Sequence, residues 1–271
     1  MTEKQSSSQK VVRCIEQSAN CWLLEVVTKA GERNVVKALR PGADQLTSAR
    51  FAREFAVLSA LRHDNLVPTF TNVEEFDGHF VMPLLEGASL RTYLDRGGPL
   101  PRATALHVTI GLLAGLAELH KAGIVHRDVK PANVFYGRQR HEPASRNRAI
   151  LLDLGIARNL TSPLTAEGMV LGTPSYFAPE QLFGGPTDER TDLYAVGLLM
   201  FELLVGERFH DRSSSPSQRF RYRYEGLSRE ARRRLVGLTE LLEVATAEDP
   251  RRRFQSAAQM SQSLVRLRGA S

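Results

Sequence analysis

The sequence predicts an α+β fold with two lobes, a strand-rich front over about residues 10–85 and a mostly helical back over about 86–268. Short segments rich in β-branched and aromatic residues alternate with polar turns in the first third of the chain. Longer apolar segments with helical spacing follow, and the character changes near Leu85–Gly87. The 271 residues suffice for one large domain or two closely packed lobes, after a flexible start at residues 1–9.

The front is predicted to contain one helix and several strands. The helix is TSARFAREFAVLSALRH (47–63), where Phe51, Phe55 and Leu58 follow helical spacing. Turn-like segments such as TKAGER and EFDGH separate the strands. The predicted strands are VVRCI (11–15), CWLLEVV (21–27), RNVVKAL (33–39), LVPTFTNVEEF (66–76) and GHFVMPLL (78–85).

The back is predicted to be built from long helices, at 104–120, 192–205, about 229–246 and near 256–267. The second of these is apolar all round, which indicates a buried helix. Its stretch LYAVGLLMFELLVG is too short to cross a bilayer and is interrupted by Glu202. The polar segment GRQRHEPASRNR (137–148) is predicted to be an exposed loop.

Composition points to an ordinary soluble globular protein, with 42% apolar and 24% charged residues. The polar start MTEKQSSSQK lacks the apolar core of a secretory signal. Two cysteines, Cys14 and Cys21, make no disulfide framework. A cytoplasmic location is therefore expected, with no membrane segment in this chain; the oligomeric state is left open.

The net charge of +6 is unevenly spread, because arginines concentrate between residues 208 and 234. Such a density can neutralise the phosphates of a nucleic acid or bind an acidic partner. No recognition helix or RNA-binding signature accompanies it, so the solvated face of a helix and its preceding loop is favoured over nucleic-acid binding. The arginines are Arg208, Arg212, Arg219, Arg221, Arg223, Arg229, Arg232, Arg233 and Arg234.

The densest chemical signal is HRDVKPAN, residues 126–133. It places Asp128, Lys130 and Asn133 on one short loop, where a carboxylate can accept a hydroxyl proton, an ammonium can steady a moving phosphoryl group and an amide oxygen can hold a metal. Asp153 in LLDLGIAR follows an apolar strand and precedes a glycine, which suits a ligand of Mg²⁺. The pattern indicates phosphoryl transfer.

With these motifs the chain resembles the eukaryotic-type serine/threonine protein kinases, and in particular their compact bacterial members, over about residues 10–268. The resemblance implies the bilobal protein kinase fold, with ATP and Mg²⁺ as cofactors (Mn²⁺ as a substitute) and proteins as substrates. Lys37 matches the lysine that contacts the α- and β-phosphates, and Glu54 matches its ion-pair partner. Helical spacing independently puts Glu54 on the apolar face, where a carboxylate needs a partner. The competing interpretation is a glutamate at the rim that reaches water.

The resemblance also implies an adenine site at VMPLLEG (81–87), with Met82 as gatekeeper. Pro83 lacks an N–H, but the family uses only the carbonyl at that position, and Leu85 supplies the donor. Val35 and Phe135 sandwich the ring in this assignment, although core packing explains both residues almost as well. The expected ATP-binding residues are Ile15, Leu23, Val35, Lys37, Met82, Pro83, Leu85 and Phe135.

GTPSYFAPE (172–180) resembles the family's substrate-seating segment, in which Thr173 bridges Asp128 and Lys130. Glu180 is expected to pair with Arg253 in DPRRRF, with the neighbouring arginines 251 and 252 left open as partners. Asp192, at the start of TDLYAVG, fits a helix cap. By resemblance, Asp192 also anchors the backbone of the catalytic loop.

Arg127 precedes Asp128, and such an arginine commonly receives a phosphate in this family. Thr161, Ser162 and Thr165 are candidates for autophosphorylation, because a phosphothreonine adds up to about −2 charge and can pair with arginine. The alternative is that they are ordinary hydroxyl residues of a loop and that Arg127 is a structural donor.

The segment IEQSANC (15–21) contains no glycine where the family has a glycine-rich phosphate loop. Glu16, Ser18 and Cys21 occupy the three glycine positions, and the Ser18 and Asn20 side chains are expected to replace some phosphate contacts. We expect weakened nucleotide affinity and a small, buried thiol at Cys21 rather than a redox switch.

Three classes of function compete. An active serine/threonine protein kinase is favoured because all residues that place metal and charge are present. A nucleotide-binding pseudokinase or scaffold is favoured only by the absence of glycine in IEQSANC. A small-molecule phosphotransferase shares the Asp-to-Asn spacing, but it does not need GTPSYFAPE, TDLYAVG or DPRRRF.

Overall fold

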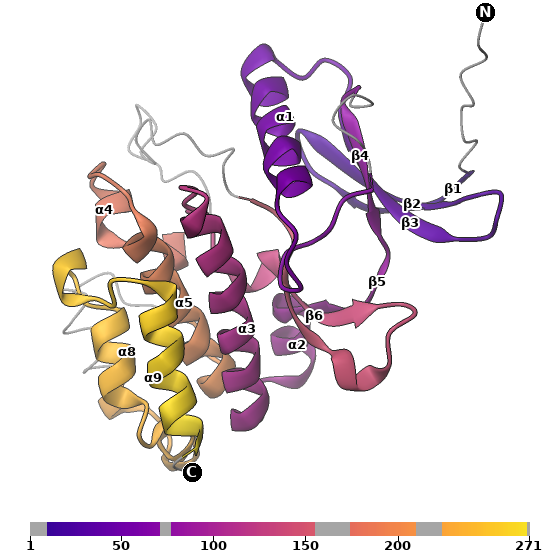
Figure 1. Cartoon of the computed structure of the whole chain (residues 1–271). Coiled ribbons are helices and arrows are strands. Elements are labelled where there is room, and N and C mark those ends of the chain that lie inside the picture. The colour runs from indigo at the N-terminus through magenta and orange to yellow at the C-terminus, as the bar shows by residue number, and fades with distance from the viewer. Residues whose placement is uncertain (1–9, 71–76, 155–173, 210–223, 270–271) are drawn as a thin grey trace, which may run out of the picture.

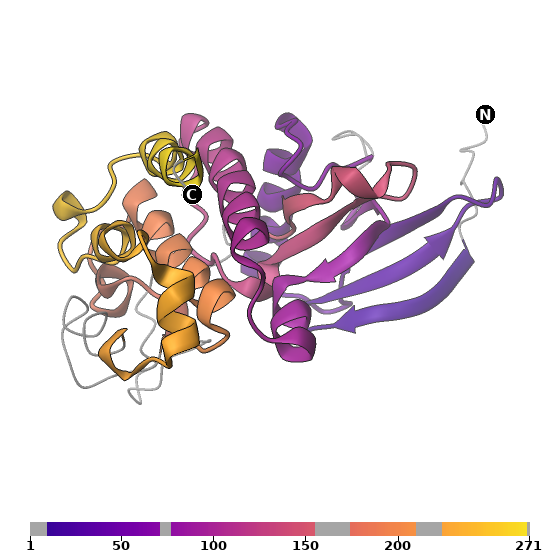
Figure 2. The ribbon, with the colours of Figure 1, turned by 90° about the horizontal axis from the view of Figure 1, so that it is seen from below.

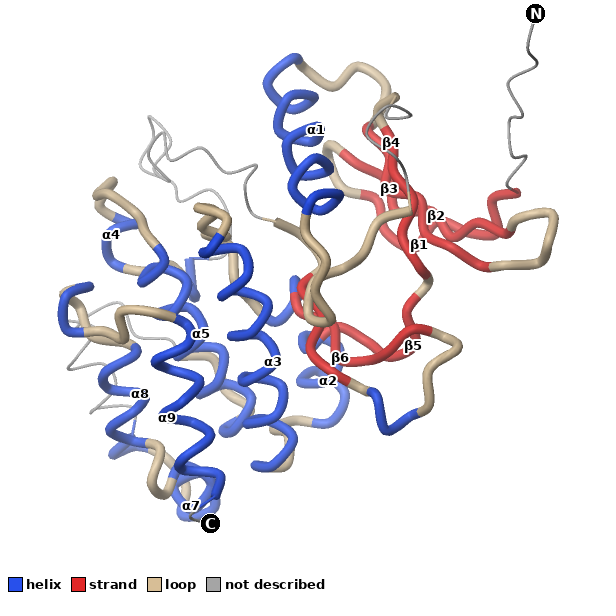
Figure 3. Tube along the Cα trace, viewed as in Figure 1, coloured by secondary structure: helices blue, strands red, loops and turns tan. Residues whose placement is uncertain are grey.

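The computed structural model describes residues 10–70, 77–154, 174–209 and 224–269 of the chain (Figure 1). Strands gather at one end of the molecule and helices at the other, with α1 the helix that lies on the strand-rich side (Figure 3). Figure 2 shows the same division from below. The two-lobed α+β class predicted from the sequence is confirmed.

The first sheet is antiparallel, with the order β1 (Lys10–Gln17), β2 (Cys21–Val27), β3 (Arg33–Leu39) and β4 (His79–Pro83). Leu23 lies opposite Lys37, and Val35 lies opposite Met82. Because side chains alternate between the two faces of a strand, these four side chains share one face of the sheet.

Helix α1 (Gln45–Ala60) is fixed to this sheet by aromatic packing. The carboxylate of Asp44 caps its start by accepting the Thr47 N–H at 2.6 Å. Phe51 and Phe55 place their rings 5.2 and 5.4 Å from that of Phe80 on β4. The helical spacing read from the sequence is confirmed, since Phe51, Phe55 and Leu58 are all buried.

The predicted strand 66–76 is wrong for residues 66–70, and residues 71–76 lie outside the described part. Pro68 has no N–H to donate, and the N–H groups of Leu66 and Val67 bond to His63 and Leu151 rather than to the first sheet. Leu66 makes an isolated parallel bridge with Leu151, and the Val67 N–H donates to the Leu151 carbonyl at 3.0 Å. The segment therefore connects the two lobes.

A second antiparallel sheet begins directly after the first, with the order β5 (Leu85–Ser89), β6 (Val134–Gln139) and β7 (Arg148–Leu151). The predicted strand 78–85 is thus divided, because β4 ends at Pro83 and β5 pairs elsewhere. The predicted exposed loop 137–148 is also shorter than expected. Its first three residues belong to β6, its last begins β7, and a 3₁₀ turn forms at Ala144–Arg146.

Gly87 and Gly137 lie opposite each other in this sheet. A Cβ atom on Gly87 would approach the Tyr136 carbonyl oxygen to 2.3 Å, and one on Gly137 would approach the Glu86 carbonyl oxygen to 2.2 Å. The close pairing of β5 and β6 therefore requires glycine on both strands.

The helical lobe is built around α5, which is buried from Thr191 to Val205. Helix α3 packs against α5, α9 and β7. By length and composition α3 is long and apolar enough to cross a membrane, the one such helix among the described residues, but half of that stretch is buried here. The helices are α2 (Leu90–Gly97), α3 (Arg102–Lys121), α4 (Pro179–Leu182), α5 (Glu189–Val205), α7 (Arg229–Leu235), α8 (Thr239–Ala245) and α9 (Ala257–Gly269), with 3₁₀ turns at Pro131–Asn133, Pro174–Tyr176 and Pro250–Arg252.

The single helix predicted over 229–246 is in fact two, α7 and α8. Gly237 between them has φ of 73°, a left-handed conformation that stops a helix. Arg229, Arg232 and Arg233 are exposed on α7, in line with the predicted solvated face. Arg212, Arg219, Arg221 and Arg223 lie outside the described residues.

Candidate active site

Lys37 sits at the centre of a three-residue charge cluster. Its Nζ lies 2.7 Å from Glu54 Oε1 and 2.6 Å from Asp153 Oδ1. Lys37 and Glu54 are buried, whereas the Asp153 side chain is 44% exposed. The expected ion pair between Lys37 and Glu54 is present, and the interpretation of Glu54 as a rim residue is wrong.

The same cluster keeps Lys37 charged. Burial alone lowers the pKa of a lysine, because it disfavours the charged form. The facing carboxylates of Asp153 and Glu54 outweigh burial and raise the pKa of Lys37 above its ordinary value. Lys37 therefore presents a positive charge throughout the neutral pH range.

Residues of the HRDVKPAN loop form a second cluster. Lys130 Nζ lies 2.8 Å from Asp128 Oδ2. Asn133 donates through Nδ2 to the main-chain oxygen of Asp128 at 2.8 Å and to its Oδ2 at 3.0 Å. The Asp–Lys–Asn spacing read from the sequence thus brings all three side chains together.

His126 joins the two clusters. Its ring Nδ1 accepts the Asp128 N–H at 3.2 Å, and its Nε2 lies 2.5 Å from the main-chain oxygen of Asp153. The Leu152 N–H also donates to the Asn133 carbonyl at 3.0 Å. Burial lowers the pKa of His126, which favours the neutral ring with one acceptor and one donor. One hydrogen-bonded chain therefore links the Asp128 and Asp153 loops.

Asp192 holds the catalytic loop by its backbone. Its carboxylate accepts the N–H groups of His126 at 2.8 Å and Arg127 at 2.7 Å, and it contacts His120 Nε2 at 2.8 Å. The cap predicted at Asp192 is wrong: α5 begins at Glu189, and Asp188 accepts the Arg190 N–H at its start. Asp192 lies in the first turn of α5 and its carboxylate faces the loop that contains His126 and Arg127. Of its two predicted roles, only the anchoring of that loop's backbone is present.

Arg127 adopts φ of 66°, the one positive value among the described non-glycine residues. This left-handed conformation is sparsely populated and persists where surrounding contacts hold it. Gln181 of α4 contributes by donating to the Arg127 carbonyl at 2.9 Å. The Arg127 Nε is buried without a hydrogen-bond partner among the described residues. Thr161, Ser162 and Thr165, the residues predicted to carry the phosphate that Arg127 receives, lie outside the described residues, as does Thr173.

The residues expected around adenine come from both sheets. Leu23, Val35 and Met82 share the face of the first sheet that carries Lys37. Pro83 ends β4 and Leu85 begins β5, so the expected hinge is the junction between the sheets. Phe135 lies on β6, with its ring against the Gly87–Gly137 pair. Ile15 on β1 is 43% exposed.

The glycine-free turn between β1 and β2 is closed by Ser18. Its hydroxyl accepts the Cys21 N–H at 3.0 Å and donates to the Cys21 carbonyl at 3.1 Å, while the Ser18 N–H donates to the same carbonyl at 3.0 Å. Arg40 adds a contact from Nη1 to the Ser18 carbonyl at 3.3 Å. The Ser18 hydroxyl expected to replace phosphate contacts is thus engaged within the turn. Cys21 is half-buried, and burial raises the pKa of its thiol.

Glu180 pairs with Arg253, which resolves the choice among three neighbouring arginines. Arg253 Nη1 and Nη2 lie 2.7 and 2.8 Å from the two carboxylate oxygens, and the Arg253 side chain is fully buried. Thr191 donates to the same carboxylate at 2.8 Å. Arg251 instead pairs with Asp249 at the surface.

A third network, which was not predicted from the sequence, ties the GTPSYFAPE segment to the helices. The buried Glu202 of α5 accepts from Tyr176 in the segment and lies 2.7 Å from Arg91 Nη1 on α2. Arg91 also contacts Asp95 at 2.9 Å. The signal available in the sequence was the single acid within the apolar stretch LYAVGLLMFELLVG, since a buried carboxylate requires partners.

The donor set at Asn133 and Asp153 fits Mg²⁺. Asn133 uses its amide nitrogen toward Asp128, which leaves its amide oxygen as an acceptor. The part-exposed Asp153 carboxylate adds an anionic oxygen. Within the described ranges no three His, Cys, Asp or Glu side chains gather as a zinc site requires. Mg²⁺ takes one or two carboxylates and completes its shell with water and phosphate oxygens.

Comparison with known proteins agrees with this geometry. The family model for the protein kinase domain matches residues 10–264. The serine/threonine-protein kinase PknB of Mycobacterium leprae is 31% identical over 251 residues, which cover 86% of this chain and 38% of that protein. PrkC of Bacillus subtilis is 33% identical over 217 residues, covering 78% and 32%. The chain therefore spans only about a third of the length of these relatives.

A solved structure shows the same architecture. The PknI kinase domain of Mycobacterium tuberculosis superposes with a TM-score of 0.69 at 26% identity, covering 96% of each chain.

Proposed function

The chain belongs to the protein kinase family, and from this premise we propose that it transfers the γ-phosphoryl group of ATP to serine or threonine hydroxyls of proteins. The observation that carries the proposal is the convergence of six polar side chains from four separate segments. They are Lys37, Glu54, Asp128, Lys130, Asn133 and Asp153.

Each residue has a role that its contacts support. Asp128 accepts the proton of the substrate hydroxyl as the hydroxyl oxygen attacks the γ-phosphorus and the bond from that phosphorus to the bridging oxygen of ADP breaks, so that ADP leaves. Lys130, 2.8 Å from that carboxylate, balances charge on the transferred group. Lys37, oriented by Glu54, contacts the α- and β-phosphates. Asn133 and Asp153 would hold Mg²⁺ or Mn²⁺, which would neutralise charge on the phosphate oxygens.

A radiolabelled-ATP assay on a generic basic protein tests the proposal, with Asp128→Ala as the inactive control. Incorporation by the wild type and none by the variant supports an active kinase. Nucleotide binding by both proteins with transfer by neither supports the second candidate, a pseudokinase. That candidate rests on one observation, the glycine-free turn closed by the Ser18 hydroxyl.

The triple variant Glu16→Gly, Ser18→Gly, Cys21→Gly is expected to lower the KM for ATP by about tenfold, the effect of regaining one charge-assisted hydrogen bond to phosphate. Glycine at position 18 frees the N–H groups of Asn20 and Cys21, which now donate to the Ser18 hydroxyl. Glycine at position 16 removes the Glu16 carboxylate, which would repel the phosphates of ATP. Steady-state kinetics with varied ATP measures the change. Ala19→Gly, which adds flexibility but leaves Glu16 and Ser18 in place, serves as control. An unchanged KM in the triple variant contradicts a role for this turn.

Autophosphorylation is part of the proposed function. The buried Nε of Arg127, which has no hydrogen-bond partner among the described residues, could donate to a bound phosphate. Mass spectrometry of recombinant protein before and after incubation with ATP and Mg²⁺ is expected to show phosphate on Thr161, Ser162 or Thr165. Arg127→Gln is expected to keep the basal rate of phosphoryl transfer, which depends on Asp128. It is expected to lose the increase in rate that follows phosphorylation of the segment. An unmodified segment refutes autophosphorylation.

The proposed role is in signalling, and the proposed location is the cytoplasm, where Cys14 and Cys21 stay reduced. With Asn133 and Asp153 proposed as metal ligands, phosphorylation of protein partners is proposed to require magnesium. Lys130-Pro131 and GTPSY resemble the serine/threonine branch and favour hydroxyl substrates of that class.

A further inference from the structure

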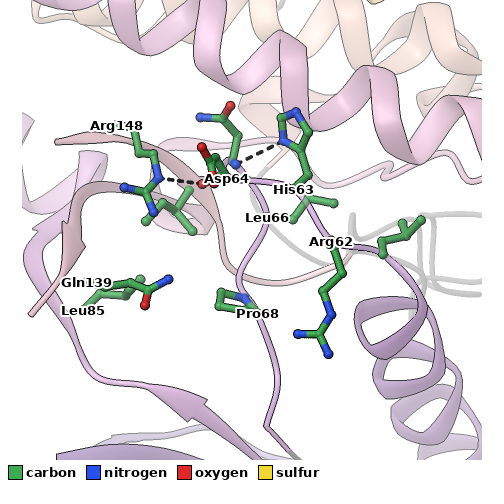
Figure 4. Close-up of a pocket in the computed structure, with 11 residues that line it drawn as sticks. Arg62, His63, Asp64, Leu66, Pro68, Leu85, Gln139 and Arg148 are labelled. Atoms are coloured by element: carbon green, nitrogen blue, oxygen red, sulfur yellow. Dashed lines mark hydrogen bonds between the residues drawn. The ribbon is translucent and has the colours of Figure 1, made fainter. Parts of the chain in front are cut away.

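A pocket of about 520 Å³ lies between the two chain segments that connect the lobes (Figure 4). One connection is residues 61–68, which run from the end of α1 toward β7, and the other enters the second sheet at Leu85. None of the proposed catalytic or metal-binding side chains lines it, and of the expected ATP-binding residues only Leu85 does. The lining residues that carry the argument are Arg62, Gln139 and Arg148, with Leu66, Pro68 and Ile150.

The walls of this pocket are held in place by hydrogen bonds between the connecting segment and β7. Asn65 Nδ2 donates to the Ala149 carbonyl at 2.6 Å, and the Leu151 N–H donates to the Asn65 carbonyl at 2.9 Å. Arg148 Nε donates to the Asp64 carbonyl at 2.8 Å. A ligand therefore meets a preformed site, which reduces the entropy lost on binding.

Hydrogen-bond donors face the pocket from both sides. Figure 4 shows Arg148 and Gln139 on one side and Arg62 on the other, with Pro68 between them. Arg62 is exposed and makes no ion pair with any other described residue. Arg148 uses Nε and Nη1, the latter 2.7 Å from Glu142 Oε2, so that Nη2 remains available. The Gln139 side-chain amide has no hydrogen bond within the described part.

Acceptors are scarce in comparison. Asp64 is the one acid among the lining residues, and no ion pair within the described residues joins it to Arg62 or Arg148. His63 and Asn65 also line the pocket, and each makes a hydrogen bond within the fold, His63 Nδ1 from the Asn65 N–H and Asn65 Nδ2 to the Ala149 carbonyl. The other lining residues are aliphatic, among them Leu66 and Pro68. An anion with an apolar body complements this combination, because guanidinium groups bind carboxylates and phosphates through paired hydrogen bonds.

We propose that this pocket is a binding site for a small amphipathic anion, a carboxylate or phosphate attached to an apolar group. Its size falls in the range of small-molecule sites. The anionic group lies between Arg62 and Arg148, and the apolar body lies against Leu66 and Pro68. The proposal stands independently of the proposed function, since it uses none of the catalytic side chains.

Two-dimensional NMR titration of the whole chain tests the proposal, with 2-naphthoate and 2-naphthyl phosphate as probes and 2-naphthylmethanol as the neutral analogue. The two anions are expected to shift the amide signals of residues 61–68 and Gln139, also with an ATP analogue present. Arg62→Gln is expected to weaken binding by about tenfold, the loss of one charge-assisted hydrogen bond. Comparing the two anions shows whether carboxylate or phosphate is preferred.

Arg53→Gln is the matched control, because Arg53 is an exposed arginine of α1 that does not line the pocket. It is expected to leave the dissociation constants unchanged. A second pocket variant, Gln139→Glu, places a negative charge on the opposite wall and is expected to weaken both anions. Equal affinity in all variants, equal binding of the neutral analogue, or shifts confined to the Lys37 cluster would overturn the proposal. Tighter binding of an acidic peptide at the same residues would overturn its small-molecule character.

Discussion

The variant Asp128→Asn is expected to transfer phosphate about 10²–10⁴ times more slowly than the wild type while keeping its fold and its affinity for ATP. Asparagine has nearly the shape of aspartate, but it cannot accept the proton of a substrate hydroxyl. Two of the contacts that position residue 128, from Asn133 to its main-chain oxygen and from its own N–H to His126, do not depend on the carboxylate. The amide oxygen of asparagine can still accept from Lys130 and Asn133, which now contact the carboxylate. The loss should therefore fall on the rate of the chemical step.

Initial rates of radiolabel transfer, the dissociation constant of an ATP analogue and the thermal midpoint separate these effects. Asp77→Asn is the matched control, because it removes an exposed carboxylate beside His79, on the turn before β4. It should leave all three measurements unchanged. Transfer by Asp128→Asn at the wild-type rate would show that another group is the base. A large fall in its thermal midpoint would show that residue 128 acts through stability instead.

Replacing Arg253 by methionine is expected to destabilise the chain by about 3–5 kcal/mol, because it leaves the carboxylate of Glu180 buried without its partner. Both side chains are nearly inaccessible, with exposures of 0% for Arg253 and 9% for Glu180. Arg253 also donates to the Ala247 carbonyl at 2.7 Å and lies over the Tyr194 ring, 4.8 Å from its centroid. Urea denaturation followed by circular dichroism measures the free energy of unfolding.

Arg251→Met provides the comparison from the same DPRRRF motif. Its side chain is 84% exposed and pairs with Asp249 at 2.9 Å on the surface. Ion pairs this exposed contribute little, so the free energy of unfolding should hardly change. Equal losses for Arg251→Met and Arg253→Met would contradict the assignment of Arg253 as the buried partner of Glu180.

Both predictions concern one feature of the fold, the attachment of the catalytic loop to the buried helix α5. Asp192 on that helix accepts two backbone N–H groups of the loop, and Gln181 of α4 holds the Arg127 carbonyl. Thr191, next to Asp192, donates to Glu180. Loss of the ion pair between Glu180 and Arg253 should therefore loosen the supports of Asp128 as well as reduce stability.

Much of the site was predictable because its evidence is local in the chain. The spacing within HRDVKPAN fixes three side chains on one loop, and they meet as expected. Glu54 was predictable from a different source. Helical periodicity put a carboxylate on an apolar face, and the cost of burying it alone required a partner, which is Lys37.

The errors have physical causes that sequence patterns do not contain. Residues 66–70 have strand-like composition, but their backbone hydrogen bonds are divided among His63, Leu151 of β7 and Val81 of β4 and form no continuous ladder. Asp192 has the chemistry of a helix cap, but Asp188 reaches the first turn and Asp192 faces the loop. Gly87 and Gly137 carry no pattern at all, because their importance lies in how closely two distant strands approach.

Residue chemistry, short spacings and periodicity were enough to predict the family and the lobe order, and to propose which side chains react. The tertiary structure alone decided which of three adjacent arginines meets Glu180, where α5 begins and why the β1–β2 turn closes without glycine. These features depend on the relative orientation of, and the distance between, segments that lie far apart in the chain. Only the packed fold brings those segments close enough for one partner to be selected.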